Sequence, residues 1–383
     1  MNTASPLTPA LKKARNSNIE LLRIIAMLVI VGCHFATHGG FDFNSQSVTL
    51  PRLWWNVLEM GGNFGVDVFV LISGYFLIEN KKLSVAPKKV LRLWGEIFFY
   101  SVALFAVAVI TKSESFSLTG AAKAFFPITF SQWWFASTYF VMFLIHPFIN
   151  RLLHSFTKRE YQVFLLVVTL LWCIIPTFTT SAYQSNPLIE FVLYYSVAGY
   201  IKLFGFRSNV KSAGWFGLWF VFCALKYLSC VCLITLGTKI SIFSDNSLHF
   251  YNRNSILTLF GAVCLFMAFA TMKPRSNRFV NTVASATFGV YLLHDSEFFR
   301  NFFWNDIFRN SSYQSTPLII PYSIAVTIAV FIGCDLIDLA RQYILEKPVF
   351  SLIGRRCERE NKASSGITDK FRKILFGKDE IID

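Results

Sequence analysis

The sequence predicts an all-α polytopic membrane protein of about ten transmembrane helices, with the N- and C-termini both in the cytoplasm. Of its 383 residues, 54% are hydrophobic and only 15% are charged, whereas soluble domains carry about 25% charged residues. Apolar runs of the length that a helix needs to cross a bilayer recur along the chain. These runs lack the alternating pattern of membrane-barrel strands, which excludes a barrel.

Ten stretches are long and apolar enough to be spans. In order, they cover residues 19–37, 62–80, 91–111, 132–153, 161–178, 188–205, 213–236, 254–272, 279–303 and 317–345. The first is expected to be a span rather than a signal peptide, because Glu20 and Arg23 stand at its start and no clear cleavage site ends it. The predicted organisation is therefore a basic N-terminal tail (1–18), a ten-helix membrane domain (19–345) and a basic C-terminal tail (346–383).

The distribution of Lys and Arg supports this count. If the N-terminus is cytoplasmic, 27 of these residues fall in cytoplasmic segments and 7 on the opposite side, as the positive-inside rule requires. The net charge of +14 then reflects loops that face anionic lipid, and no nucleic acid partner is expected. The eight cysteines lack the spacing of a zinc or disulfide framework, so no metal is expected.

Three ionisable residues in the first span are the strongest functional candidates, because burying such groups in a membrane costs several kcal/mol. Arg23 and His34 lie within about 20° of the same helix face and about 16 Å apart along the axis. Glu20 is spaced to pair with Arg23. This face predicts a catalytic histidine, and the structural alternative is a snorkelling arginine with a core histidine that bonds a neighbouring helix.

The second span carries a buried carboxylate, Asp67, among the small residues Gly61, Gly62 and Gly65, which predict close helix packing. Asp67 is expected at a depth similar to that of His34, where it would orient the imidazole and favour its protonated form. The alternative is that Asp67 caps the helix start.

A basic loop follows the second span. Residues 81–92 contain five cations, of which Lys88, Lys89 and Arg92 share one helix face. Such a cluster can bind the phosphates of a nucleotide-bearing donor. A loop that only determines topology would look the same.

Together these segments resemble the acyltransferase-3 family of integral-membrane acyltransferases. The matching features are Glu20-x-x-Arg23 followed by His34, the sequence GVDVFVLISGYFL over 65–77, Lys89-Val-Leu-Arg92, and the segments 132–147 and 288–295. The family has Arg-x-x-Arg where this chain has Lys89-Val-Leu-Arg92, so the charge is kept but the bidentate geometry of the first arginine is lost. The resemblance covers the whole ten-span chain.

The resemblance implies a membrane-bound O-acyltransferase of the bacterial cytoplasmic (inner) membrane. It implies transfer of an acyl group, usually acetyl from acetyl-CoA, to a hydroxyl of a surface carbohydrate or lipid-linked glycan. His34 would be the catalytic base or nucleophile with support from Arg23, and the basic loop would bind the donor. Acetyl-CoA would be a co-substrate, and no bound cofactor is expected.

Further candidates lie on the acceptor side. His294, near the outer end of the ninth span, is expected either to contact the acceptor or to be a polar helix end. Trp133 and Tyr139 are either sugar-stacking rings or anchors at the membrane interface.

Two other functions compete with acyl transfer. A secondary transporter or flippase is the main alternative, but the chain lacks an internal repeat and paired Gly/Pro-broken helices. A glycan polymerase or ligase would carry functional Arg and His residues in a large outer loop. The longest predicted outer loop, residues 38–61, holds only Arg52 and His38.

Overall fold

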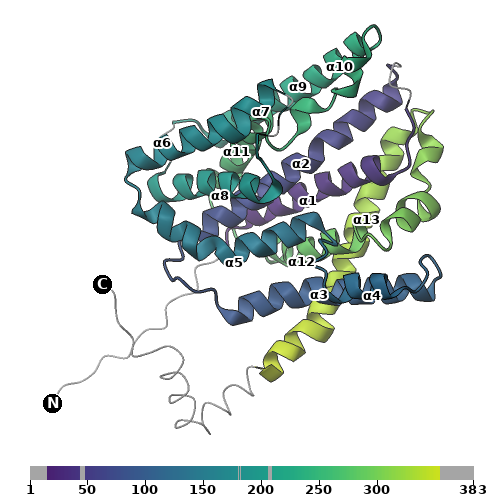
Figure 1. Cartoon of the computed structure of the whole chain (residues 1–383), viewed down its shortest axis with the longest axis horizontal. Helices are drawn as coiled ribbons and strands as arrows, with labels where there is room; N and C mark the ends of the chain where they lie inside the picture. The colour runs from purple at the N-terminus through teal and green to yellow at the C-terminus, as the bar shows by residue number, and fades with distance from the viewer. Residues whose placement is uncertain (1–14, 44–47, 180, 182, 206–208, 354–383) are drawn as a thin grey trace, which may run out of the picture. The chain divides into compact units, whose positions relative to one another are not determined.

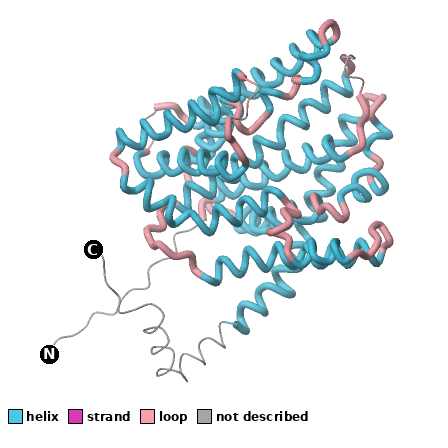
Figure 2. The backbone as a smooth tube through the Cα atoms, viewed as in Figure 1, coloured by secondary structure: helices cyan, strands magenta, loops and turns pink. Residues whose placement is uncertain are grey.

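A computed structural model describes residues 15–43, 48–179, 181, 183–205 and 209–353. Within these ranges every regular element is helical and no strand occurs (Figures 1 and 2), which confirms the predicted fold class. The α-helices are α1 (Ser17–His38), α2 (Leu50–Leu77), α3 (Pro87–Ile110), α4 (Leu118–Phe125), α5 (Trp134–Ser155), α6 (Lys158–Thr169), α7 (Ile175–Phe178), α8 (Pro187–Phe204), α9 (Ser212–Gly237), α10 (Ser241–Asp245), α11 (Ile256–Ala270), α12 (Arg278–His294) and α13 (Ile319–Arg341). Short π and 3₁₀ turns are η1 (Leu170–Ile174), η2 (His249–Tyr251), η3 (Phe302–Ile307), η4 (Asn310–Tyr313) and η5 (Gln342–Glu346).

Eight helical segments of the described chain are long and apolar enough to cross a membrane, so the protein is a polytopic membrane protein. α5 and α12 form where the fourth and ninth spans were predicted, but they are not among these eight. α12 stops after 17 residues. Ten spans and cytoplasmic termini therefore stay predictions, and residues 1–14 and 354–383 of the two predicted tails lie outside the described residues.

Two predicted boundaries are wrong. α2 begins at Leu50 rather than at residue 62, because Pro51 occupies the first turn, where a helix tolerates the missing N–H. The predicted outer loop 38–61 therefore shrinks to residues 39–49. The predicted span 279–303 ends at His294, where Asp295 leaves the helical conformation (φ −109°, ψ 17°).

α1 lies between α2 and α12 (Figure 1). Glycines allow α2 to approach α1 closely, as predicted: a Cβ on Gly65 would lie 2.6 Å from the backbone oxygen of Ala26. Gly61 and Gly62 face Val29 and Cys33 in the same way. This small-residue face fixes the phase of α2 relative to α1.

α1 and α12 run in parallel and stay in register over their length. At one end, the backbone N–H of Asn277 donates to Ser17 Oγ at 2.7 Å. At the other end, His34 meets His294 at 2.9 Å, and both contacts join residues 260 positions apart. Two helices that keep this offset over about 26 Å bring their last turns together, and the polar site forms there.

The chain divides within α13 into two compact units, residues 1–335 and 336–383. In the second unit, Arg341 Nε donates to Asp338 at 2.7 Å, and Arg341 Nη1 donates to Glu346 at 3.0 Å. The sequence offered no role for Asp338, and this ion pair supplies a structural one. All the site residues described below belong to the first unit.

Candidate active site

His34 and His294 form the centre of the site, with Nδ1 of His34 lying 2.9 Å from Nε2 of His294. His294 is buried, and its Nδ1 lies 2.6 Å from the carbonyl oxygen of Val290. Because a carbonyl oxygen can only accept, this Nδ1 carries the proton and Nε2 of neutral His294 is an acceptor. His34 must then donate from Nδ1. The pair therefore fixes the tautomer of His34 with Nε2 unprotonated.

Asp295 supplies a buried negative charge beside the pair. One of its carboxylate oxygens lies 3.8 Å from His34 Nδ1, 3.3 Å from His38 Nε2 and 3.7 Å from Arg300 Nη1. Arg300 can balance this charge while His34 is neutral. If His34 gains a proton at Nε2, the imidazolium already has a counter-ion within ion-pair distance.

A cavity of about 230 Å³ lies beside His34. Its polar lining includes His34, Thr37, His38, Glu59 and Asn63, and its apolar lining includes Phe69, Trp134 and Phe135. Glu59 Oε2 lies 3.7 Å from the thiol of Cys33. Pockets with mainly apolar walls and a few converging polar groups are typical of small-molecule sites. Here the cavity lies directly beside the imidazole of His34.

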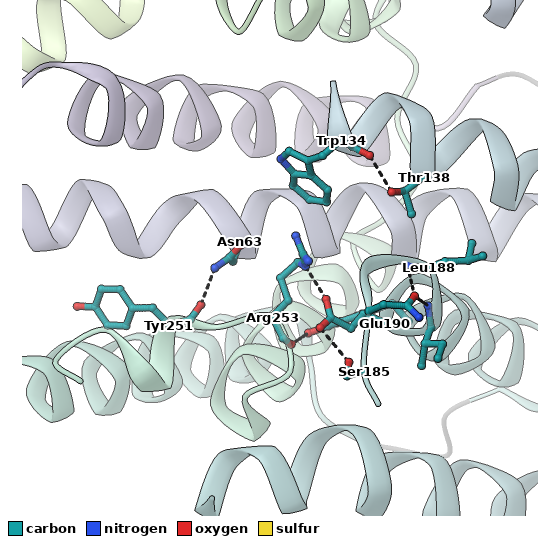
Figure 3. A network of polar contacts seen from close by, with 11 residues as sticks. Asn63, Trp134, Thr138, Ser185, Leu188, Glu190, Tyr251 and Arg253 are labelled. Atoms are coloured by element: carbon teal, nitrogen blue, oxygen red, sulfur yellow. Dashed lines mark hydrogen bonds and ion pairs between the residues drawn. The ribbon is translucent and has the colours of Figure 1, made fainter. Parts of the chain in front are cut away.

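The ring of Trp134, which forms part of the cavity wall, packs against an arginine that belongs to an ion pair. The guanidinium carbon of Arg253 lies 4.3 Å from the ring centre of Trp134, and Arg253 Nε donates to Glu190 at 2.7 Å. Figure 3 shows the Arg253 side chain between the Trp134 ring and the Glu190 carboxylate. Ser185 Oγ donates to the same carboxylate at 3.0 Å. The cation–π contact and the ion pair together fix the ring of Trp134.

The predicted contact between Asp67 and His34 is wrong. Asp67 is fully buried, but helix phase turns it away: Gly65 packs against α1, and Asp67 lies two residues further, about 200° around α2. Its charged neighbours are Arg253, Glu190 and Lys226. The carboxylate beside His34 is that of Asp295.

The Arg23–Glu20 pair lies on α1 as predicted, with Arg23 Nε 3.8 Å from Glu20 Oε2. Arg23 Nε is buried and has no hydrogen-bond partner among the described residues. The helical separation of about 16 Å keeps Arg23 from touching His34. Catalytic roles for Arg23 and Glu20 stay predictions.

The structure places the acceptor-side candidates at three different positions. His294 lies behind His34 rather than in the cavity lining. Trp133 is buried, with 2% of its surface exposed, so it is not a lipid-facing anchor. Its neighbour Trp134, the first residue of α5, lines the cavity. Tyr139 lies one turn beyond the lining residue Phe135 and receives a hydrogen bond from Ser73 Oγ at 3.3 Å.

The basic cluster lies at the start of α3, where the structure separates its members. Lys89 lines a second cavity together with Lys82, whereas Lys88 and Arg92 are exposed on the same helical turns and are not part of that lining. Binding of the donor by these residues stays a prediction.

The polar cluster also resembles a metal-ligand set, since the ligand atoms of His34, His38 and Asp295 all lie within 4.8 Å of one another. Two imidazoles and a carboxylate are a common zinc donor set. Arg300, however, adds a positive charge to the same carboxylate, and Nδ1 of His34 already donates to His294. The donor set therefore fits a cation poorly, and a protein without bound metal stays the prediction.

Sequence reasoning missed Glu59, His38, Asp295, Arg300, Arg253 and Glu190. Two of them had a local signal: His38 follows His34 by one helical turn, and Asp295 is adjacent to His294. Glu59 was assigned to a loop because the second span was started too late. The Arg253–Glu190 pair joins α8 to the turn before α11, 63 positions further along the chain, so no local pattern predicts it.

Fold and site define a polytopic membrane protein with a half-buried histidine, His34, beside a cavity. A family model for an acyltransferase domain, that of the acyltransferase-3 family, matches residues 16–338. The chain therefore belongs to the acyltransferase-3 family and is a membrane acyltransferase. No curated protein and no solved structure matches it.

Proposed function

We propose that this acyltransferase moves an acetyl group from acetyl-CoA to a hydroxyl of a surface carbohydrate or lipid-linked glycan, in the bacterial cytoplasmic membrane. The observation that carries the proposal is the hydrogen bond between His34 and His294. This bond leaves Nε2 of His34 as an unprotonated nitrogen beside a cavity that also contains Glu59 and Asn63. An acceptor hydroxyl in this cavity would meet a base and polar groups able to orient it.

In the proposed reaction, Nε2 of His34 takes the proton from the acceptor hydroxyl as its oxygen attacks the thioester carbonyl. The new C–O bond forms, the C–S bond breaks, and the thiolate of coenzyme A receives the proton from the imidazolium. Asp295 stabilises the imidazolium between these two transfers. A route in which Nε2 attacks the carbonyl and forms an acyl-imidazole before passing the acyl group to the hydroxyl requires the same free nitrogen.

Arg23 would act on the donor rather than on His34. It lies on the same face of α1, about 16 Å nearer the end that the charge distribution predicts to be cytoplasmic. Its buried Nε offers a hydrogen-bond donor without a partner among the described residues. A donor that enters from the cytoplasm would pass this group before its thioester reaches His34.

The test is transfer from labelled acetyl-CoA to candidate glycolipids by the purified protein and its His34→Ala variant. Transfer should fall by at least about a hundredfold, which is the usual contribution of a general base. His249→Ala is the matched control, because His249 bonds the Thr177 carbonyl at 3.0 Å and does not line the cavity. Retained transfer in folded His34→Ala would overturn the proposal. Glycolipid movement across vesicles without acylated product would favour a flippase.

A further inference from the structure

A second cavity, of about 470 Å³, lies where α2 ends and α3 begins. Its lining includes Leu77, Asn80, Lys82, Ala86 and Lys89 from this connection, with Phe143 and His146 from α5. α5 fixes the connection from behind: Asn150 Nδ2 donates to the carbonyl oxygens of Leu77 and Asn80 at 2.8 and 2.9 Å. The cavity wall is therefore held in place.

The inner end of this cavity contains a histidine that the proposed mechanism does not use. Pro147 follows it in α5 and has no N–H, so the carbonyl of Phe143 lacks its usual helical donor. Nδ1 of His146 takes that place, 2.5 Å from the Phe143 oxygen. Nδ1 therefore carries the proton, and Nε2 of the neutral ring is an acceptor.

The other ring nitrogen of His146, Nε2, has no role within the protein that the structure shows. The side chain is 1% exposed, and this nitrogen has no hydrogen-bond partner among the described residues. A buried polar atom without a partner is costly, and because the residue His146 lines a cavity, we expect its Nε2 to bond a ligand there. The ligand group must be an N–H or O–H donor, because neutral Nε2 accepts.

A row of stacked rings on α5 connects this cavity to the one beside His34. Successive ring centres of Phe135, Tyr139, Phe143 and His146 are 5.9, 6.4 and 5.3 Å apart, and neighbouring rings are inclined by 19–24°. Phe135 lines the His34 cavity, and Phe143 lines the second cavity. Their separation of eight positions corresponds to about 12 Å of helix. An extended molecule lying along this face would touch both cavities.

The outer part of the second cavity suits an anion. Lys82 and Lys89 line it, and so does Ala86, the residue that caps the N-terminus of α3. Cations and the N-terminal end of a long helix both attract phosphate. The cavity thus combines a positive outer part with a hydrogen-bond acceptor deeper inside.

We propose that this cavity binds the acyl donor, with the nucleotide phosphates at Lys82 and Lys89 and with an amide N–H or hydroxyl of the pantetheine arm donating to Nε2 of His146. The arm then follows the α5 rings toward His34. This inference rests on the proposed function, since it assigns the donor of that reaction to a site. It makes His146 a binding residue for the donor arm rather than a helix-stabilising residue alone.

Two substitutions separate binding from a structural role. His146→Asn keeps an amide near the position of Nδ1, where it can still bond the Phe143 carbonyl, but it removes Nε2. His146→Gln keeps a polar atom near the position of Nε2 and loses the bond to Phe143. We expect His146→Asn to weaken coenzyme A binding about tenfold with melting near wild type. His146→Gln should melt lower and bind coenzyme A more tightly than His146→Asn.

Shortened probes test which part of the donor each residue contacts. S-acetylpantetheine lacks the nucleotide, so its affinity should fall in His146→Asn and stay unchanged in Lys89→Gln. Adenosine 3′,5′-bisphosphate lacks the arm, so its affinity should fall in Lys89→Gln and stay unchanged in His146→Asn. Coenzyme A should be sensitive to both substitutions.

The outcomes distinguish this inference from the proposed function. If folded His146→Asn binds coenzyme A and S-acetylpantetheine as tightly as wild type, the inference is overturned, and acetyl transfer by the wild type still stands. If wild-type protein binds no coenzyme A at millimolar concentration, the proposed function itself fails. Weaker binding in His146→Asn, together with wild-type binding in His249→Ala, supports the inference.

Discussion

His294 and His146 are both buried, and each donates Nδ1–H to a backbone carbonyl of its own helix, at 2.6 and 2.5 Å. They differ in what meets Nε2. In His294 it accepts from His34, whereas in His146 it has no hydrogen-bond partner among the described residues, and the residue lines a cavity. One local arrangement therefore serves two purposes. The first fixes a protonation state inside the protein, and the second leaves an acceptor for a ligand.

Because the two histidines differ in this way, substitutions around each are expected to change a different measured quantity. A residue that acts through His34 should change turnover and leave donor affinity unchanged. A residue that contacts the donor should change affinity first. Comparing kcat with the dissociation constant of coenzyme A in matched variants therefore tests the assignment of each histidine.

The largest effect is expected at His294. His294→Leu leaves the Nδ1–H of His34 without its acceptor, so the ring can turn or change tautomer, and kcat should fall on the order of a hundredfold. The measurement is steady-state acetyl transfer with coenzyme A affinity determined separately. That affinity should match wild type.

His294→Gln is the conservative control, because its side-chain oxygen can accept near the position of Nε2, and it should recover at least part of the turnover. A His294→Leu protein with normal kcat would remove the positioning role. A His294→Leu protein with normal kcat but weakened coenzyme A binding would make the two histidines equivalent and break the comparison.

A smaller effect is expected in the basic loop, where the structure separates lining from non-lining cations. Lys82→Gln combined with Lys89→Gln should weaken coenzyme A binding about ten- to thirtyfold, because two exposed phosphate contacts are lost and both are screened by water. Lys88→Gln combined with Arg92→Gln removes the same charge and should cost less than about threefold. Titrations at two salt concentrations should show a reduced salt dependence in the first variant.

Equal weakening in both double variants would show that the loop acts only as a diffuse positive field. In that case Lys89 would lose its distinction from the neighbouring cations. Correct membrane insertion of both proteins must be confirmed, since the loop also contributes to the predicted topology.

The sequence was most informative along single helices. The face shared by Arg23 and His34 and the Glu20–Arg23 pair follow from the helical period. The small residues of α2 predicted close helix packing, and the structure shows that the partner is α1. The sequence did not predict which residues of different helices contact each other. The partners of His34 are His294 and Asp295, about 260 residues away, and they meet only because α1 and α12 keep the same offset over their length.

Helix boundaries account for most of the other errors. Starting the second span at residue 62 put Glu59 in a loop, and extending the ninth to residue 303 hid the polar turn at Asp295. Average hydropathy places such ends poorly, because polar residues that line a cavity lower the hydropathy of a helix without ending it. The two alternatives for Trp133 and Tyr139 stayed open for a related reason: neither an aromatic ring at an interface nor one beside a cavity shows its neighbours in the sequence.

The smallest effect on turnover is expected at Asp67, which the sequence placed beside His34 and the structure places among other charges. Asp67→Asn should leave kcat within about twofold of wild type, because Asp67 has no contact with the histidine pair. Stability should fall by about 1–3 kcal/mol, since the buried surroundings of Asp67, which include Lys226 and Arg253, lose a carboxyl group. Combining it with Lys226→Met removes one charge of each sign, so the double variant should regain part of the lost melting temperature, and the double-mutant cycle gives the coupling. A tenfold loss of kcat in folded Asp67→Asn, with no stability coupling to Lys226, would return Asp67 to the catalytic group and show that Asp295 is not the carboxylate that serves His34.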